Sequence, residues 1–358
     1  MKILYLANSL DTKSGWGRFS REIITRVIDS GHDVKILTEV NSGFDGEVTI
    51  LKRSWSAIYT AFKVRRYIKE NNIDIVHSLE LNPYAITAYF ASFGLGIKHI
   101  ITATGAYSVR PLHQPLTRWL VKHIYTRAYS VLCISQYIED EIKKEVWLKN
   151  SSVIPLGINH EKFSGDRQIP SEPFILSVGN LSYRKGYHIS VAAFVRVAKK
   201  HPNIKYYIAG NIDKNIYSEC QKIIIDNNIK DRVVFLGSID DKRLRELYLS
   251  AELFILTSVN HDFHFEGFGL VFLEAASAGL PVIGTRDNGI AAAVSEGFNG
   301  LLVEQNNIEQ TSQAILKILE DSNLKESFSK ASIEWSKNNS WDNVVKKYLE
   351  IYQNAKNL

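Results

Sequence analysis

Cysteine is scarce in this sequence of 358 residues: it has two, Cys133 and Cys220, one in each half of the chain. Two cysteines so far apart fit neither a metal-binding motif nor a disulfide framework, so we expect both thiols to be reduced and structural. No run of 18 apolar residues occurs, which predicts that no helix spans a membrane. The first residues lack the apolar core and cleavage site of a signal peptide. We therefore expect a cytoplasmic protein, without a metal ion or other cofactor.

Charge is distributed unevenly along the chain. Residues 1–170 contain 22 Lys and Arg against 16 Asp and Glu, a net charge of +6, whereas residues 171–358 contain 21 against 22, a net charge of −1. Two stretches of the first half, 52–69 and 118–127, combine basic and aromatic residues. Such a surface suits an anionic membrane, at the inner membrane face; a core-facing helix with a solvated basic side explains the pattern equally well. Nucleic acid is not an expected partner, because no recognised nucleic-acid-binding module accompanies the charge.

Short apolar runs alternate with helical stretches, which predicts an α/β protein whose parallel sheets are covered by helices on both faces. The chain is too long for one ordinary core, and the pattern restarts at Pro173 after a polar stretch, 161–172, that we interpret as a linker. The sequence thus predicts two Rossmann-like domains, over residues 1–165 and 173–340. An amphipathic helix is expected over residues 341–358.

The segment 265–274 is the most informative part of the chain. Glu266 and Glu274 bracket seven residues, and two glycines lie just after the first carboxylate. The apolar residues that follow predict a helix beginning at about Phe268, whose free N–H groups and positive dipole end favour an anion. At ~1.5 Å per helical residue, the two carboxylates are roughly 10 Å apart along the axis, which suits hydroxyl groups on both sides of a diphosphate. A nucleotide sugar has this layout.

Two further segments point to phosphate binding. Residues 175–186 predict a buried strand, a glycine turn and the basic pair Arg184 and Lys185 before the next helix. Cations there neutralise a diphosphate and stabilise it as a leaving group. After the first strand, Gly15 and Gly17 precede a helix, so that backbone amides can approach a ligand closely. Trp16, between them, either stacks on an acceptor sugar or caps the helix.

These segments resemble the retaining glycosyltransferases of family 4, which have the two-domain GT-B fold. The resemblance implies two Rossmann-like domains that face each other across a cleft, with the acceptor on the first domain and the nucleotide-sugar donor on the second. It also implies that the terminal helix crosses back to the first domain; the alternative is that this helix packs on its own domain.

The resemblance further assigns roles to single residues. Glu266 and Lys185 would be the catalytic residues; Glu266 would contact the donor sugar and Glu274 the ribose. The donor-binding residues that it implies are Gly15, Gly17, Asn180, Arg184, Lys185, Gly267, Phe268, Gly269, Leu270, Val271 and Glu274. The candidates on the acceptor or cleft side are Trp16, Thr104 and His264, the last because it lies just before Glu266.

The sequence departs from the family pattern at two positions. Asn180 stands where the family usually has an arginine, and Arg184 is the candidate for supplying the missing charge. Thr104 stands where many members have a histidine, and a hydroxyl cannot transfer a proton as an imidazole does. What replaces that histidine is left open.

The prediction is therefore a retaining glycosyltransferase of the hexosyl or N-acetylhexosaminyl class. It would move a sugar from a nucleotide-diphosphate sugar to a hydroxyl of a sugar or lipid-linked acceptor, in polysaccharide or glycolipid biosynthesis. Two alternatives are a nucleotide-sugar epimerase or phosphorylase with the same fold, and a non-catalytic nucleotide-sugar-binding module. The presence of Glu266, Glu274 and Lys185 argues against the module. The sequence does not identify the sugar, the base or the acceptor.

Overall fold

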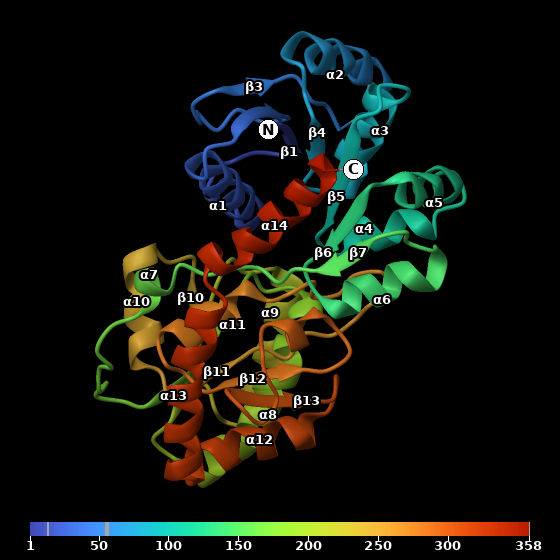
Figure 1. Cartoon of the computed structure of the whole chain (residues 1–358). Coiled ribbons are helices and arrows are strands. Elements are labelled where there is room, and N and C mark those ends of the chain that lie inside the picture. The colour runs from blue at the N-terminus through green and yellow to red at the C-terminus, as the bar shows by residue number, and fades with distance from the viewer. Residues whose placement is uncertain (13, 54–56, 358) are drawn as a thin grey trace. The chain divides into compact units, whose positions relative to one another are not determined.

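The computed structural model describes residues 1–12, 14–53 and 57–357 (Figure 1). The chain divides into two compact units, which we call unit 1 (Met1–Leu156 together with Trp341–Leu358) and unit 2 (Gly157–Ser340). Each unit contains one parallel sheet with helices on both faces, as the alternating pattern predicted.

The boundary between the units differs from the predicted one. The stretch 161–172, expected as a linker, belongs to unit 2, which begins at Gly157. It contains the helix α7 (His160–Phe163), whose Phe163 is buried with its ring edge-on to that of Tyr248, 5.9 Å between centroids. Arg167 donates a hydrogen bond to the carbonyl of Tyr248 at 3.1 Å. These contacts, made to a distant part of the chain, anchor a stretch whose composition is that of a linker.

Unit 1 is built on a seven-stranded sheet with the order β3-β2-β1-β4-β5-β6-β7. Its strands are β1 (Lys2–Ala7), β2 (Asp33–Thr38), β3 (Glu47–Thr49), β4 (Ile75–Ser78), β5 (Lys98–Ala103), β6 (Ser130–Cys133) and β7 (Ser151–Val153). Its helices are α1 (Gly15–Asp29), α2 (Ala57–Asn71), η1 (Leu81–Ala85), α3 (Ile86–Ser92), α4 (Ala106–Val109), η2 (Arg110–Leu112), α5 (Arg118–Arg127), α6 (Gln136–Glu145) and α14 (Trp341–Lys356). Right-handed crossovers place α1 on one face and α2, α3 and α5 on the other. The strand order reverses between β1 and β4, where such sheets bind ligands beyond the strand ends.

The last helix, α14, packs on unit 1 beside α1, as the resemblance implied (Figure 1). Its Tyr352 lies in a buried hydrogen-bonded chain: the hydroxyls of Tyr5 and Tyr352 are 2.7 Å apart, and Tyr352 Oη is 2.7 Å from Nδ1 of His77. The other ring nitrogen of His77 lies 2.8 Å from Oγ1 of Thr102. Burial lowers the pKa of His77 to about 3, so this imidazole is neutral. The chain of partners satisfies every ring nitrogen and hydroxyl in it, which makes α14 part of the core of unit 1.

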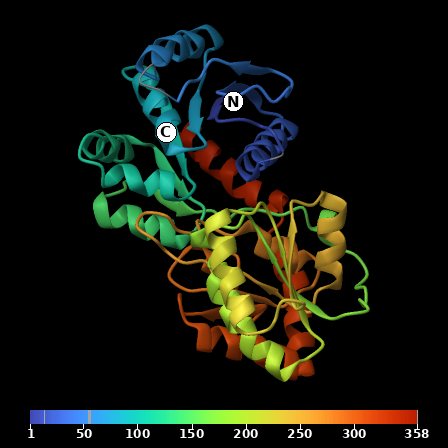
Figure 2. The same ribbon diagram turned by 180° about the vertical axis from the view of Figure 1, so that it is seen from behind.

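Unit 2 is built on a six-stranded sheet with the order β10-β9-β8-β11-β12-β13. Its strands are β8 (Phe174–Val178), β9 (Lys205–Ala209), β10 (Val233–Gly237), β11 (Phe254–Ile255), β12 (Val282–Thr285) and β13 (Gly300–Val303). Besides α7, its helices are η3 (Tyr183–Lys185), α8 (Tyr187–Lys200), α9 (Lys214–Asp226), α10 (Asp241–Ser250), α11 (Leu270–Ser277), η4 (Gly289–Ala292), α12 (Ile308–Glu320) and α13 (Ser322–Asn338). Seen from behind in Figure 2, α8 and α9 cover the near face of this sheet. The strand order reverses between β8 and β11, and the loops after these two strands carry the basic pair and Glu266.

Two further features concern membrane-spanning helices and the two cysteines. Within the described ranges, no helix is both long and apolar enough to cross a bilayer. Cys133 and Cys220 are buried and unpaired, as predicted, and burial raises the pKa of the Cys220 thiol to about 12. These thiols are therefore part of the core, not reactive groups.

Candidate active site

Two cations converge on one carboxylate at the strand ends of unit 2. Nη1 of Arg184 lies 2.5 Å from Oε2 of Glu266, and Nζ of Lys185 lies 2.6 Å from the same oxygen. Ser258, near the start of the loop after β11, is 3.5 Å from it through Oγ. Only 9 % of Glu266 is exposed, and such burial by itself raises the pKa of a carboxyl; the charges of Lys185 and Arg184 outweigh burial and hold the pKa at about 2. Glu266 is therefore ionised at any physiological pH.

Gly186, whose backbone is in the left-handed conformation, helps to position Arg184 and Lys185. Arg184 and Lys185 lie in the single turn η3, which ends at Gly186 with φ 66°. A Cβ atom at residue 186 would lie 1.8 Å from the carbonyl oxygen of Thr257, so no larger residue fits. Thr257 donates a side-chain hydrogen bond to Gly186 O at 2.7 Å, and Val259 N donates to Arg184 O at 2.8 Å. These two hydrogen bonds fix the loop after β8 against the loop after β11.

The backbone of Glu266 is held by the loop after β12. Gly289 N donates to Glu266 O at 2.8 Å, and a Cβ atom at residue 289 would lie 1.9 Å from Gly267 O. Next to this contact, Thr285 Oγ1 donates to Ser258 O at 2.6 Å. Two backbones that approach so closely leave the backbone of Glu266 little freedom of position.

The helix after Glu266 begins two residues later than predicted. α11 starts at Leu270, because Gly269 adopts a left-handed conformation with φ 83°. Gly269, as the N-cap residue, provides no side-chain hydrogen bond to the first amides of α11. Phe268 is buried in the core, whereas Gly267, Leu270 and Val271 are partly exposed. The end of the helix dipole that favours anions is therefore free of a side-chain cap and lies directly after Glu266.

Glu274 lies in the second turn of α11 and is buried. Its Oε2 accepts a hydrogen bond from the hydroxyl of Tyr248, on α10, at 3.0 Å. The sequence did not single out Tyr248, since a tyrosine on a helix is usually a packing residue. This contact orients the carboxylate that the resemblance assigns to the ribose.

Asn180 and His264 lie outside the ionic cluster. Oδ1 of Asn180 accepts a hydrogen bond from Asn211 N at 3.4 Å, so this side chain orders the neighbouring loop. The backbone of His264 is paired with that of His261, and its side chain is exposed. Of the candidates in unit 2, the structure therefore brings together Glu266, Arg184 and Lys185, and does not bring the imidazole of His264 to them.

The remaining candidates lie in unit 1. Gly15, Trp16 and Gly17 form the first turn of α1, where Ser14 Oγ accepts a hydrogen bond from Gly17 N at 3.0 Å. The ring of Trp16 is edge-on to that of Phe19, with 6.3 Å between centroids, and is 37 % exposed, so it caps the helix and still presents a surface. Thr104 is buried after β5, with its amide donating to Ser108 Oγ at 3.0 Å.

Sequence reasoning missed a polar cluster at the strand ends of unit 1. Asn8, Glu39 and Glu80 follow β1, β2 and β4, the strands on either side of the reversal in strand order. The hydroxyl of Tyr84 donates to Glu39 Oε2 at 2.5 Å, and Arg53 contacts both carboxylates at 3.3 Å. Burial raises the pKa of Glu80 to about 7, although Arg53 opposes the shift. A polar residue directly after a buried strand was the available signal for this cluster.

Comparison with known proteins agrees with this geometry. The family model described as "Glycosyl transferases group 1" matches residues 159–335, and the model described as "Glycosyltransferase Family 4" matches residues 13–162. An uncharacterised glycosyltransferase of Methanocaldococcus jannaschii is 25 % identical over 303 residues, which cover 84 % of this chain and 81 % of that protein. The glycogen synthase of Mycobacterium tuberculosis is 26 % identical and covers 96 % of this chain and 91 % of its own length.

A solved structure shows the same fold. HepE of Anabaena in complex with UDP superposes with a TM-score of 0.83 at 20 % identity, covering 99 % of this chain and 100 % of that one. The same protein has also been solved in complex with UDP-glucose, with a TM-score of 0.79 at 18 % identity over the full length of both chains. Identity this low supports the fold alone. Together with the two family models, which divide the chain where its two sheets divide it, these findings show that the chain belongs to the family 4 glycosyltransferases with the GT-B fold.

Proposed function

We propose that this protein is a retaining glycosyltransferase that moves a sugar from a nucleotide-diphosphate sugar to an acceptor hydroxyl. The observation that carries the proposal is the convergence of Arg184 and Lys185 on Glu266, directly before the uncapped first turn of α11. A diphosphate needs cations and amide donors, and a sugar hydroxyl needs a carboxylate acceptor. All three kinds of group are present at the reversal of strand order in unit 2.

Glu266 pairs with both cations, and the three side chains together keep a net charge of +1. A donor diphosphate would compete for the two cations, and the carboxylate so released would accept a hydrogen bond from a hydroxyl of the donor sugar. In the transfer step, the bond between C1 of the sugar and the diphosphate oxygen breaks, and its electron pair stays on the diphosphate. Lys185, Arg184 and the amides of α11 stabilise that charge. The acceptor oxygen forms its bond to the same face of C1, and its proton passes to the leaving phosphate.

The donor that we propose is a uridine diphosphate sugar of the hexosyl or N-acetylhexosaminyl class. HepE was solved with UDP and with UDP-glucose, and the two chains share one fold over nearly their full lengths. Glu274, oriented by Tyr248, is the group that we assign to the ribose hydroxyls. No metal ion is required in this scheme, since the two cations perform the neutralisation.

The acceptor that we propose is the hydroxyl of a sugar or a lipid-linked sugar, in the synthesis of a polysaccharide or glycolipid. The basic first half of the chain, with a net charge of +6, favours an acceptor that carries phosphate or lies at an anionic membrane. The polar cluster of Asn8, Glu39 and Glu80 supplies groups suited to sugar hydroxyls in unit 1.

A thermal-shift panel of UDP, GDP and ADP and their sugars tests the proposal. We expect one nucleoside diphosphate to raise the melting temperature of the wild-type protein and Lys185→Ala to abolish this shift. Lys222→Ala, on the exposed surface of α9, should retain the shift and serves as the matched control. If no nucleoside diphosphate binds, the proposal is wrong. The reaction products distinguish the enzymatic alternatives. A transferase forms a bond between the donor sugar and an acceptor, an epimerase rearranges the free nucleotide sugar, and a phosphorylase cleaves a glycosidic bond with phosphate.

A further inference from the structure

Among the described residues, the most strongly exposed aromatic side chains lie in unit 1. Among the side chains that the structure describes, the aromatic ones with exposures of 68 % to 75 % are Tyr59, Phe62, Phe93, Trp119 and Trp147. They lie on α2 and α5 or directly after α3 and α6. In the described part of unit 2, the most exposed aromatic residue is Tyr183, at 46 %. Such an uneven distribution marks an interaction surface.

These residues form a continuous surface. The ring of Trp119 stacks on His123 at 5.8 Å, His123 Nε2 lies 2.9 Å from the hydroxyl of Tyr89, and the rings of Tyr89 and Phe93 are 6.1 Å apart. Arg65 of α2 donates to the carbonyl of Phe93 at 2.6 Å, which joins α2 to the same surface. We call it the aromatic surface of unit 1.

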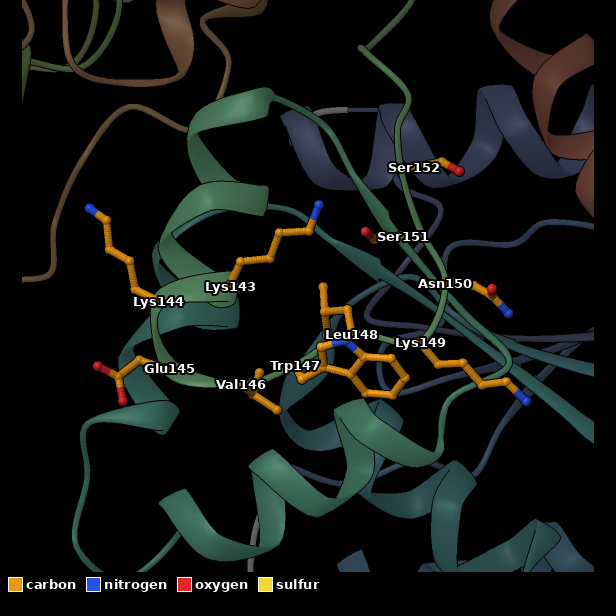
Figure 3. A pocket seen from close by; sticks show the side chains of 10 residues that line it. All are labelled: Lys143, Lys144, Glu145, Val146, Trp147, Leu148, Lys149, Asn150, Ser151 and Ser152. Carbon is orange, nitrogen blue, oxygen red and sulfur yellow. The ribbon is translucent and has the colours of Figure 1, made fainter.

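Two hollows continue the surface. One, of about 830 Å³, is lined by Tyr89 and Phe93 and by the cations Lys98, Arg127 and Lys149. The other, of about 890 Å³, contains Trp147 and shares Lys149 with the first. Figure 3 shows the indole of Trp147 between the side chains of Lys143 and Lys149. Both hollows lie where the chain enters β5, β6 and β7, at the opposite edge of the sheet from Asn8, Glu39 and Glu80. They are therefore separate from that polar cluster.

The charge of this surface is strongly positive. The stretches 59–71, 89–98, 116–127 and 136–150 contain eleven Lys and Arg against five acidic residues, a net charge of +6. Four of the cations are paired: Arg66 with Glu70, Lys122 with Glu145, Lys143 with Glu139 and Lys144 with Glu141. The cations Lys98, Arg127 and Lys149, which line the first hollow, are not among these pairs. A second copy of the same surface would be repelled by this charge, whereas an anionic partner would be attracted.

We propose that the aromatic surface of unit 1 docks on a bilayer that contains anionic lipids. Trp and Phe side chains favour the level of the lipid headgroups, and Lys and Arg beside them bind the lipid phosphates. Both hollows are lined by such cations and open next to an exposed ring, Phe93 in one and Trp147 in the other, which suits a headgroup with its acyl chains beside the ring. This inference does not depend on the proposed function, because it involves none of the residues of unit 2.

Cosedimentation of the full chain with vesicles tests the inference. We expect binding to vesicles of phosphatidylcholine with 30 % phosphatidylglycerol, chosen as an anionic probe, at least tenfold stronger than to pure phosphatidylcholine. The double variant Trp119→Ser/Trp147→Ser should lower the affinity at least tenfold, and Lys98→Glu/Lys149→Glu should lower it as much. The matched control is Lys222→Glu/Ile225→Ser on α9, where an exposed cation and an exposed apolar residue line a smaller hollow of about 430 Å³. It should bind as the wild type does.

Three outcomes would overturn the inference: equal pelleting with both kinds of vesicle, no pelleting with either, or unchanged pelleting of both surface variants. A wild type that elutes as a dimer, and becomes a monomer in the tryptophan double variant without any vesicle binding, would assign the surface to a second copy instead. Binding of nucleoside diphosphates, measured on the same samples, reports on the proposed function separately, and unchanged binding shows that the variants are folded.

Discussion

Lys185 and Glu266 lie 2.6 Å apart, although 81 residues separate them along the chain. The contact joins the loops after β8 and β11, the two neighbouring strands between which the order of the sheet reverses. Arg184 reaches the same carboxylate oxygen, so one buried anion serves two cations. In the function that we propose, these cations bind the diphosphate, and Glu266 then accepts a hydrogen bond from a hydroxyl of the donor sugar.

The first prediction follows from this competition. Glu266→Gln keeps the shape of the side chain but removes the charge that competes with a diphosphate for Lys185 and Arg184. We expect the affinity for the free nucleoside diphosphate to rise about three- to tenfold, while sugar transfer falls at least a hundredfold, roughly 3 kcal/mol in the transition state. Calorimetric titration and a transfer assay measure the two effects. Glu326→Gln, on the exposed surface of α13, is the control, and a loss of both binding and transfer would contradict the competition.

The second prediction concerns the positive charge that the family's arginine provides and that Asn180, at the same position, does not. If Arg184 has taken over the role of the family arginine, Arg184→Ala should weaken binding of the nucleoside diphosphate about tenfold, as expected for loss of one charge-assisted contact of roughly 1.4 kcal/mol. Adding Asn180→Arg to this variant should restore part of the affinity. Arg243→Ala, whose partner Glu246 is also exposed, is the control. Unchanged affinity in Arg184→Ala would show that this guanidinium serves only Glu266.

The third prediction concerns pH and stability. Burial raises the pKa of Glu80 from 4.5 to about 7 in the folded chain, so the folded state binds the proton more tightly than the unfolded state does. Its contribution to stability is complete below the unfolded pKa and is lost as the pH rises through about 7. The contribution of Glu80 to the free energy of unfolding should therefore fall by up to roughly 3 kcal/mol between pH 4.5 and pH 8. The buried imidazole of His77 acts in the opposite direction below pH 6.5, because its pKa is lowered in the folded chain, so the effect of Glu80 is read as a difference between the wild type and a variant.

Urea denaturation across this pH range measures the effect. Glu80→Gln, which is neutral at every pH, lacks this contribution, so the free energy of unfolding of the wild type minus that of the variant should fall between pH 4.5 and pH 8. Glu70→Gln, an exposed change on α2, should leave the pH profile as in the wild type. A difference between the wild type and Glu80→Gln that stays constant across this window would mean that Arg53 keeps Glu80 ionised throughout.

The fourth prediction concerns the attachment of the last helix. Tyr352→Phe removes the hydroxyl that lies between Tyr5 and His77 and leaves their polar atoms buried with one partner fewer. Loss of a buried partner costs about 1–3 kcal/mol, which should appear as a lower melting temperature. Tyr59→Phe, at an exposed position of α2, should change the stability by less than about 0.5 kcal/mol. Equal melting temperatures for both variants would show that α14 is held by apolar packing alone.

Much of the fold could be predicted because its signals are local. Apolar runs that alternate with helical stretches indicate parallel sheets wherever they occur, and both sheets formed as predicted. The predicted start of α11 is two residues too early. The sequence does not show that Gly269 adopts the left-handed conformation, which delays the start of the helix to Leu270. The stretch 161–172 looked like a linker, because its anchoring contacts with Tyr248 come from residues about 80 positions away.

The candidate site was only partly predictable for the same reason. Glu266, Glu274, Lys185 and Arg184 were all named from short motifs, but no motif predicted that Arg184 and Lys185 contact the same oxygen of Glu266. The polar cluster of Glu39 and Glu80 went unnoticed, because its members come from separate strands and meet only when the sheet forms. The stretch 52–69 was predicted to form a basic and aromatic surface. Its Trp55 lies outside the described residues. The aromatic surface of unit 1 also includes Phe93, Trp147 and Lys149, which lie outside that stretch.

The sequence by itself determined the class of fold, its two sheets and the family, since each rests on periodicity or on motifs shorter than a dozen residues. Tertiary structure alone decided which cation joins Lys185 on Glu266, that this carboxylate stays ionised despite its burial, and that α14 belongs to the core of unit 1. These depend on contacts between residues some 80 to 350 positions apart. Their strength comes from distance and burial in the folded chain, quantities that no local pattern of residues encodes.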